Sequence, residues 1–187
     1  MPDKSDLKGL MEGLVTALGG KTSVPEGAQV VSDFDLTRYL GTWYEIARLD
    51  HDFERGMSHV TAHYEQRDDD SIAVINRGWL SEQQRWDEAH GKAQPETDDP
   101  RQGRLRVAFF GPFYAGYNVL YVDFSYRHAV IAGPTHDYLW LLARTPHPEE
   151  SDIERMTACA RANGFDTDRL IRVAQSEGAL PQSGLSD

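Results

Sequence analysis

Residues 33–48 read Asp33-Phe34-Asp35-Leu36-Thr37-Arg38-Tyr39-Leu40-Gly41-Thr42-Trp43-Tyr44-Glu45-Ile46-Ala47-Arg48. Asp35 can cap a short helical turn, because its carboxylate accepts hydrogen bonds from backbone N–H groups that lack a partner in the first turn. Gly41 lets the chain leave that turn, and the residues that follow favour a strand. This stretch therefore predicts a capped turn that leads into a first strand at Trp43.

The pattern Gly41-x-Trp43-Tyr44-x-Ile46-Ala47 resembles the first signature of the lipocalins. Tyr138-Leu139-Trp140-Leu141-Leu142-Ala143-Arg144 resembles their last barrel strand, whose terminal arginine lies over the tryptophan of the first strand. The resemblance covers about residues 33–175. Through residues 38–48, 133–144 and the run Phe109-Phe110-Gly111-Pro112-Phe113-Tyr114, the chain looks most like the bacterial lipocalins, which are relatives of apolipoprotein D.

The resemblance implies an all-β fold, namely an eight-stranded antiparallel up-and-down barrel followed by a C-terminal helix. In such a barrel Gly41, Trp43 and Arg144 would close the base. The spacing of short apolar runs and turn residues agrees with a barrel or sandwich. It predicts strands at 43–49, 58–66, 72–79, 85–94, 104–110, 117–123, 128–132 and 138–143.

The two ends of the chain add helices to this pattern. An apolar stripe at helical spacing predicts an amphipathic helix over residues 7–18, and it consists of Leu7, Leu10, Met11, Leu14, Val15 and Leu18. The stripe is expected to pack on the barrel wall or across a dimer contact, with binding to a membrane surface as the alternative. A second helix is expected at 149–163 and a short edge strand within 165–173. The chain then divides into an N-terminal helix and linker (1–32), the barrel domain (33–175) and a flexible tail (176–187).

Composition excludes some classes of function. The 187 residues contain 19 Lys and Arg against 30 Asp and Glu, and the resulting net charge of −11 disfavours binding to nucleic acid. No apolar run is long enough to span a bilayer, and the single Cys159 cannot form an internal disulfide. The first residues lack the layout of a signal peptide or lipid-anchor cysteine, so a cytoplasmic or soluble protein is expected. The alternative is the periplasm or outer membrane, as in the bacterial relatives, if the natural N-terminus has been trimmed.

Strand alternation predicts which side chains face the barrel interior, because successive residues point to opposite faces. On the first strand Glu45 and Ala47 should share the face of Trp43. The full inward set is apolar and aromatic with a few polar points, which is typical of a small-molecule cavity. The candidate ligand-binding residues are Tyr39, Glu45, Asn76, Val107, Phe109, Tyr117, Tyr121, Tyr138 and Trp140.

The resemblance implies binding and transport or storage of a hydrophobic ligand, most often a fatty acid or lysophospholipid. An oligomerising interaction protein, with the aromatic loop 109–117 in a contact such as a homodimer, is one alternative. A barrel enzyme acting on an apolar substrate is another, and Glu45 is its sole candidate for a titrating group in the cavity. No catalytic constellation, metal site or cofactor is expected, because Cys159 falls on the trailing helix and the histidines, His59 and His63 included, are scattered.

Overall fold

The computed structural model describes residues 6–175, and the tail expected at 176–187 lies outside them. The elements run in the order α1 (Leu7–Ala17), α2 (Leu36–Tyr39), β1 (Gly41–Leu49), β2 (Met57–Gln66), β3 (Ile72–Leu80), β4 (Arg85–Pro95), β5 (Arg104–Ala108), β6 (Ala115–Val122), β7 (His128–Ala132), β8 (Leu139–Ala143), α3 (Glu150–Ala162), a 3₁₀ turn (Thr167–Arg169) and β9 (Leu170–Arg172). The expected helices at both ends, the edge strand and the eight barrel strands are all present.

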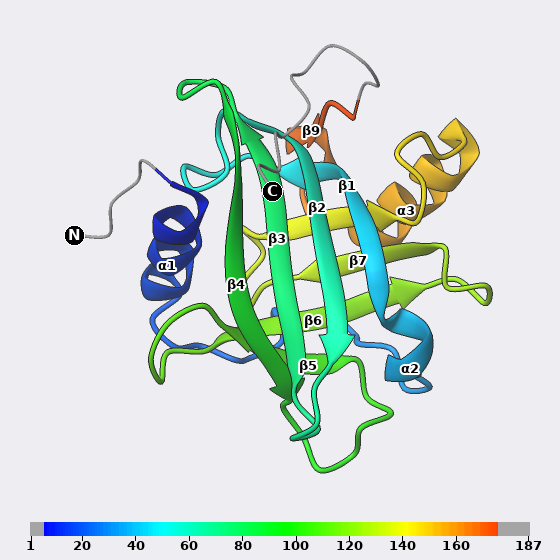
Figure 1. The fold of residues 1–187 in the computed structure, drawn as a ribbon. Coiled ribbons are helices and arrows are strands. Elements are labelled where there is room, and N and C mark those ends of the chain that lie inside the picture. The colour runs from blue at the N-terminus through cyan, green and yellow to red at the C-terminus, as the bar shows by residue number, and fades with distance from the viewer. Residues whose placement is uncertain (1–5, 176–187) are drawn as a thin grey trace.

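The strands form one closed antiparallel barrel. Their order is β2-β3-β4-β5-β6-β7-β8-β1, and β1 also pairs with β2, which closes the sheet on itself. The first half of β1 pairs with β2, whereas its second half pairs with β9. Helix α3 lies on the outside of the barrel (Figure 1). The eight-stranded up-and-down barrel expected from the sequence is confirmed.

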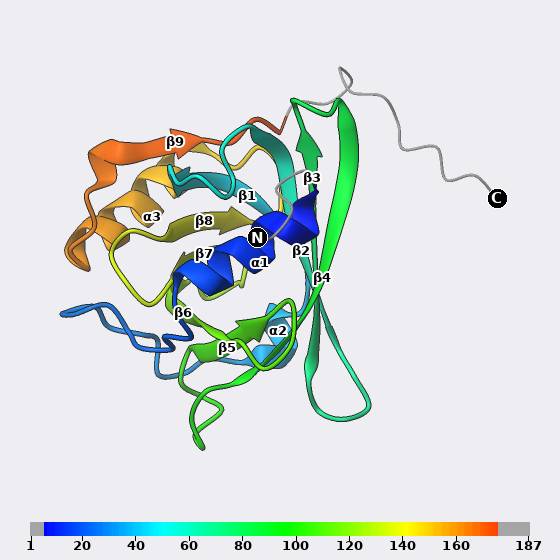
Figure 2. The same cartoon turned by 90° about the vertical axis from the view of Figure 1, so that its left-hand side faces the viewer.

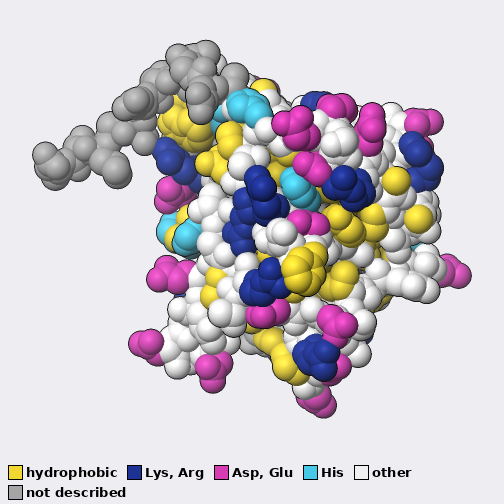
Figure 3. Space-filling model, turned by 90° about the vertical axis from the view of Figure 1, so that its right-hand side faces the viewer, with side chains coloured by type: hydrophobic (Ala, Val, Ile, Leu, Met, Phe, Trp, Pro, Cys, Tyr) yellow, Lys and Arg dark blue, Asp and Glu magenta, His cyan; other side chains and the backbone are white. Residues whose placement is uncertain are grey.

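Two apolar layers stabilise this arrangement. One fills the barrel interior around Tyr39, Trp43 and Tyr64. The other lies between the barrel wall and α3, where Ile153 and Met156 pack against residues such as Leu141. On the face of the molecule turned toward the viewer in Figure 3, acidic and basic side chains are interspersed with apolar ones.

The described strands contain β-bulges in β1, β2 and β6, and those in β1 and β6 correct two expectations. In β1 the pairing shifts between Glu45 and Ala47, so that Glu45 pairs with Leu142 and Ala47 with the next residue, Leu141. A bulge inserts one extra residue and therefore reverses which face later side chains occupy. Ala47 consequently packs in the outer layer against α3, contrary to its predicted inward direction.

The second bulge lies in β6, where the pairing with β7 shifts between Val119 and Tyr121. Val119 belongs to the interior layer, whereas Tyr121 packs with the outer layer beside α3. The prediction that Tyr121 faces the cavity is therefore wrong. The aromatic loop, expected at 109–117, begins where it was expected but ends earlier, because β5 ends at Ala108 and β6 starts at Ala115.

Helix α1 lies across one end of the barrel (Figure 2) and α2 lies at the other (Figure 1). Asp6 caps α1 by accepting a hydrogen bond of 2.7 Å from the Gly9 N–H. The apolar stripe of α1 packs against the barrel in two groups. Leu7, Leu10 and Met11 contact a cluster that includes Met57 and Leu80, and Leu14, Val15 and Leu18 contact one that includes Ala115, Phe109 and Trp140. The expected packing on the barrel is thus found at its mouth rather than on its outer wall.

Candidate ligand-binding site

The barrel encloses a cavity of about 100 Å³ beneath α1. Most of its lining surface is apolar, and the lining residues come from α1 and its C-cap, the β1–β2 and β5–β6 loops and every barrel strand except β4. The lining residues are Met11, Leu14, Val15, Leu18, Glu45, Glu54, Val60, Ala62, Tyr64, Val74, Asn76, Val107, Phe109, Ala115, Gly116, Tyr117, Ile131, Trp140 and Leu142. A largely apolar cavity with a few polar groups is the usual form of a small-molecule site.

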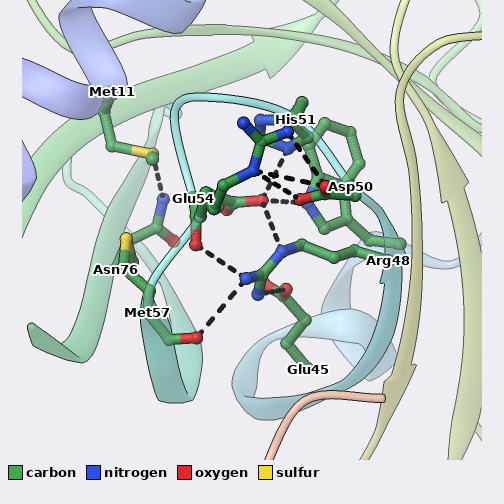
Figure 4. A network of polar contacts seen from close by, with 10 residues as sticks. Met11, Glu45, Arg48, Asp50, His51, Glu54, Met57 and Asn76 are labelled. Atoms are coloured by element: carbon green, nitrogen blue, oxygen red, sulfur yellow. Dashed lines mark hydrogen bonds and ion pairs between the residues drawn. The ribbon is translucent and has the colours of Figure 1, made fainter. Parts of the chain in front are cut away.

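A buried network of charged side chains forms one wall of this cavity. Arg48, which is 2% exposed, donates to Glu45 Oε1 at 2.8 Å and to the backbone oxygen of Glu54 at 2.6 Å. Figure 4 shows Arg48 between these two acidic residues. Because the β1 bulge directs Arg48 inward, the arginine supplies the positive charge that a pair of buried carboxylates requires.

Glu54 is held by a second set of donors. Its Oε2 lies 2.8 Å from His51 Nε2 and accepts a hydrogen bond of 2.8 Å from Trp140 Nε1. Burial alone would raise the pKa of Glu54, but the contacts with His51, Arg48 and Trp140 outweigh it and lower that pKa. Burial, followed by the nearby negative charge of Glu54, raises the pKa of Glu45 to about 8 even though Arg48 opposes the shift. Glu54 is therefore the lasting negative charge of the network, and Glu45 is the group that titrates near neutrality.

Each carboxylate retains one oxygen for a ligand. The hydrogen bonds from Arg48 and Trp140 occupy Glu45 Oε1 and Glu54 Oε2. Within residues 6–175 no donor is bonded to Glu45 Oε2 or Glu54 Oε1, although both side chains are about 95% buried and line the cavity. Glu54 Oε1 is therefore open to a hydrogen-bond donor of a ligand, whereas Glu45, whose pKa is raised to about 8, offers an O–H donor at lower pH.

Tyr64 and Tyr117 form the floor of the cavity, and Tyr39 lies one layer beneath them. The Tyr117 hydroxyl lies 2.5 Å from that of Tyr39 and 2.9 Å from that of Tyr64. Burial raises the pKa of all three phenols, so they stay protonated. Tyr39 in turn stacks on Trp43, with 4.8 Å between the ring centroids. The floor is therefore a rigid, uncharged aromatic layer above the closed end.

The closed end follows the pattern that the sequence predicts. The Arg144 guanidinium carbon lies 3.9 Å from the centroid of the Trp43 indole. Gly41 has φ +98°, and a Cβ atom there would lie 3.2 Å from Arg144 Nη1. A side chain at Gly41 would both strain the backbone and press on the guanidinium. Gly41, Trp43 and Arg144 thus act together as the structural base of the barrel.

The structure brings six of the nine predicted binding residues into the cavity lining, and they are Glu45, Asn76, Val107, Phe109, Tyr117 and Trp140. Tyr39 lies one layer deeper, in contact with Tyr117. Tyr138 precedes β8 and packs against the rings of His51 and Trp140 without lining the cavity, and Tyr121 lies outside the barrel. Direct contact of each lining residue with a ligand stays a prediction.

Sequence reasoning missed Glu54 and the contribution of α1. The spacing of Glu45, Arg48 and Glu54 shows two acids around one arginine, which is a signal for a buried network once one member is known to face inward. The α1 stripe was recognised, but a stripe does not identify the surface that it covers. In the structure the stripe reaches a predicted cavity residue, because the Asn76 side-chain nitrogen lies 3.5 Å from Met11 Sδ of α1.

The histidines and the cysteine that could bind a metal or act as a nucleophile lie apart in the part of the chain that the structure describes. No group of three or more His, Cys, Asp or Glu side chains within residues 6–175 is arranged to hold a metal ion. His63 contacts Thr42 and His59 contacts Ser58, so the two histidines do not form one site. Cys159 is a half-buried free thiol on α3, and burial raises its pKa. Among the described helices, none is long and apolar enough to cross a membrane.

Comparison with known proteins identifies the family. Residues 34–175 match the family described as "Lipocalin-like domain". The chain belongs to the lipocalin family. This lipocalin is 51% identical over 162 residues to the outer membrane lipoprotein Blc of Citrobacter freundii, a match that covers 87% of this chain and 90% of the relative. It is 28% identical over 177 residues to apolipoprotein D of Bos taurus, with 91% and 90% of the two chains covered.

A solved structure shares the fold of this lipocalin. Insecticyanin from the tobacco hornworm Manduca sexta superposes with a TM-score of 0.70 at 21% identity, and the match covers 87% of this chain and 92% of insecticyanin. The family match and the Citrobacter freundii relative confirm the resemblance inferred from residues 33–48 and 138–144. Lipocalins of this kind are binding and transport proteins rather than enzymes, and they bind hydrophobic ligands.

Proposed function

We propose that this lipocalin binds a single-chain lipid, such as a fatty acid or lysophospholipid, in the barrel cavity and transports or stores it. The observation that carries this proposal is the cavity itself, because apolar side chains line it and the few polar groups gather on one wall and on the floor. An acyl chain can pack against the apolar side, while its polar head lies near Glu45 and Glu54. A cavity with an apolar side and a polar side suits a lipid that has one acyl chain and one polar head.

The energetics support a carrier of moderate affinity. Burial of a chain of about 16 carbons would contribute roughly 12 kcal/mol at about 0.8 kcal/mol per methylene. Association costs about 4 to 15 kcal/mol in lost freedom of motion. The difference is at most about 8 kcal/mol, which corresponds to a dissociation constant that is micromolar at its tightest. Such an affinity, with loose selectivity for chain length, suits a protein that must release its cargo.

The charged wall favours a particular type of head. The free oxygen of Glu54 accepts hydrogen bonds, Glu45 keeps its proton below a pKa of about 8, and the neighbouring cation, Arg48, is already engaged with both residues. The carboxylate of a fatty acid would meet the negative charge of Glu54, whereas a hydroxyl group can donate to Glu54 and accept from the protonated Glu45. We therefore place a lipid with a glycerol hydroxyl ahead of a free fatty acid among the candidate ligands.

Native mass spectrometry of the protein as purified tests the carrier function. We expect one lipid per barrel, and extraction with organic solvent should release a single-chain lipid that chromatography can identify. An empty barrel that also takes up no added acyl lipid would contradict the proposal. In that case the alternative from the sequence, an oligomerising interaction protein such as a homodimer, would become the better candidate, and sedimentation over a range of concentrations would measure it.

We also propose a location in the cell envelope. The support comes from the bacterial relatives, whose name describes an outer membrane lipoprotein. A single-chain lipid carrier has ready access to its cargo at such a membrane. Cell fractionation with an antibody against the protein tests this location, and recovery of the protein in the cytoplasm alone would contradict it.

A further inference from the structure

We propose that α1 and Leu18, together the lid helix (residues 7–18), occupy the acyl-binding part of the cavity and swing outward about Gly19 and Gly20 when a lipid enters. This inference rests on the proposed function, because it concerns the same cavity. It adds that the chain regulates its own binding site through a segment that lies outside the family match at residues 34–175.

The size of the cavity is the first observation. With α1 in place the cavity measures about 100 Å³. Ligand pockets usually measure about 300 to 1,000 Å³. A cavity of about 150 Å³ accommodates one benzene molecule. A lipid chain longer than a few carbons therefore cannot enter unless part of the wall moves.

The lid helix is the part of the wall best placed to move. Met11, Leu14, Val15 and Leu18 line the cavity from above, and each is at most 8% exposed. Figure 2 shows α1 lying across the end of the barrel, whereas the rest of the wall consists of paired strands, Glu54 of the β1–β2 loop and Phe109 of the β5–β6 loop. These four apolar side chains pack against the same cavity surface that the acyl chain of a bound lipid would contact. The lid helix and the acyl chain should therefore exclude each other.

The linker fixes the position of the hinge. Immediately after the lid helix, the Lys21 backbone oxygen accepts a hydrogen bond from the Gly116 N–H at 2.9 Å, and the Ser23 oxygen accepts one from Asn118 Nδ2 at 3.0 Å. The linker lies so close to β6 that a Cβ atom at Gly116 would come within 3.1 Å of the Thr22 backbone. The chain is thus anchored from residue 21 onward.

Gly19 and Gly20 lie between this anchor and the lid helix. They have φ values of +61° and +72°, and no atom lies within 4 Å of the position that a Cβ would take at either residue. Glycine adopts both positive and negative φ readily, so these two residues can change conformation without steric cost. The structure therefore provides a fixed base, a two-residue hinge and a helix whose apolar face fills the cavity.

Few polar contacts oppose this motion. The Leu7 N–H donates to Asp87 Oδ2 at 3.0 Å, and Asn76 Nδ2 makes a weak contact of 3.5 Å with Met11 Sδ. The Lys21 N–H also donates to the Leu18 backbone oxygen at 3.1 Å, across the two hinge glycines. Water at the mouth of the barrel can replace each of these three contacts. The lid helix is consequently held mainly by apolar contacts, which an acyl chain can replace.

Hydrogen–deuterium exchange of the full chain tests the lid directly. The probe is 1-monopalmitoylglycerol, kept below its aggregation concentration, and exchange is compared with and without it by mass spectrometry. We expect exchange to increase at least about threefold in peptides that cover residues 7–18 and to decrease in peptides from β6 and β8. Unchanged or decreased exchange in residues 7–18, with the probe bound, would overturn the lid.

A pair of full-length variants tests the competition between lid and lipid. Val15→Asn places a polar group on the face that lines the cavity, where Val15 is 2% exposed, and Thr16→Asn makes the neighbouring change on the exposed face. Valine, threonine and asparagine have similar helix propensities, so the comparison isolates the contact with the cavity. We expect Val15→Asn to lower the dissociation constant of the probe by about threefold or more, and Thr16→Asn to leave it unchanged.

The outcomes separate the two proposals. A weaker affinity in Val15→Asn would mean that Val15 contacts the bound lipid from a lid that stays closed, and it would overturn this inference while the carrier function stands. An equal affinity in the two variants would also overturn it. If the wild type and both variants take up no probe, the carrier function fails and the lid fails with it.

Discussion

The guanidinium group of Arg144 lies on the face of the Trp43 indole, with 3.9 Å between the guanidinium carbon and the ring centroid. The same group donates hydrogen bonds to the backbone oxygens of Arg38, Tyr39, Thr42 and Tyr126. A single side chain from the end of the barrel thus joins α2, β1 and the β6–β7 turn. Its role is to close the barrel beneath the cavity.

Arg144→Lys should destabilise the protein, because an ammonium group cannot reach several carbonyl groups in a planar fork. The loss of hydrogen bonds and of part of the cation–π contact predicts a decrease of about 2 to 4 kcal/mol in the free energy of unfolding. Urea denaturation measures it. Arg155→Lys, at an exposed arginine paired with Asp152, is the matched control and should change the free energy by less than about 1 kcal/mol. Equal effects in the two variants would contradict the structural role.

Glu45→Gln should alter how stability depends on pH. Burial raises the pKa of Glu45 from 4.5 to about 8, so the folded protein retains a proton that the unfolded chain releases within this interval. Stability of the wild type should therefore fall as pH rises from about 5 to 8, relative to a variant without the titrating group. The free energy of unfolding of Glu45→Gln minus that of the wild type should increase by up to about 1.4 kcal/mol per pH unit.

The groups that surround Glu45 define the control for this experiment. Arg48, Glu54 and Tyr64 face Glu45, and His51 acts on it through Glu54. Glutamine still accepts the hydrogen bond from Arg48, so the network should persist. Glu65→Gln, at an exposed position of β2, should leave the pH profile unchanged. A pH-independent difference between Glu45→Gln and the wild type would mean that Glu45 titrates in the ordinary range of a carboxyl group.

Tyr117→Phe should destabilise the cavity floor. The variant removes the hydroxyl that joins Tyr39 and Tyr64, and it leaves two buried hydroxyl groups without their shared partner. The expected cost is about 1 to 3 kcal/mol in thermal or chemical unfolding. Tyr44→Phe is a suitable comparison, because Tyr44 is a partly buried tyrosine beside the outer apolar layer and lies away from the cavity floor. A cost no larger than that of Tyr44→Phe would show that the three hydroxyls do not act as a unit.

Trp140 should report ligand binding by its fluorescence. It lines the cavity and donates its indole N–H to Glu54, whereas Trp79 and Trp86 pack against each other and do not line the cavity. Trp140→Phe should therefore remove most of the change in tryptophan emission when 1-monopalmitoylglycerol binds. Trp86→Phe should retain it. Calorimetry shows that the ligand still binds to each variant, and a persistent signal in Trp140→Phe would place the ligand elsewhere.

The charged wall should discriminate between head groups. At pH 8.5 Glu45 and Glu54 both carry negative charge, so palmitate should bind about tenfold more weakly than 1-monopalmitoylglycerol, since like charges about 4 Å apart repel by about 1 to 4 kcal/mol. Glu54→Gln should reduce this difference by improving the affinity for palmitate. Competition with a fluorescent lipid measures both affinities. Tighter binding of palmitate than of the glycerol ester by the wild type would refute this preference.

The sequence by itself determined the barrel and its closed end. Gly41, Trp43 and Arg144 are recognisable because each carries out a task that few residue types can, namely a positive φ, a large flat apolar face and a planar set of donors. The interior of β3 and β5 was also predictable, since no bulge interrupts the alternation that carries Asn76 and Val107 inward. These features depend on local geometry, which a sequence encodes directly.

Tertiary structure alone decided the direction of the side chains after each bulge and the place of the lid helix. Bulges in β1 and β6 arise from pairing with β8 and β7, and they turn Ala47 and Tyr121 outward and Arg48 inward. The apolar stripe of α1 could cover any apolar surface of matching shape, and only the folded barrel provides its open mouth. The alternation of a strand and the apolar stripe of a helix show which side chains share a face. They do not show which neighbouring strand or surface that face packs against, and that contact determines where the side chains lie.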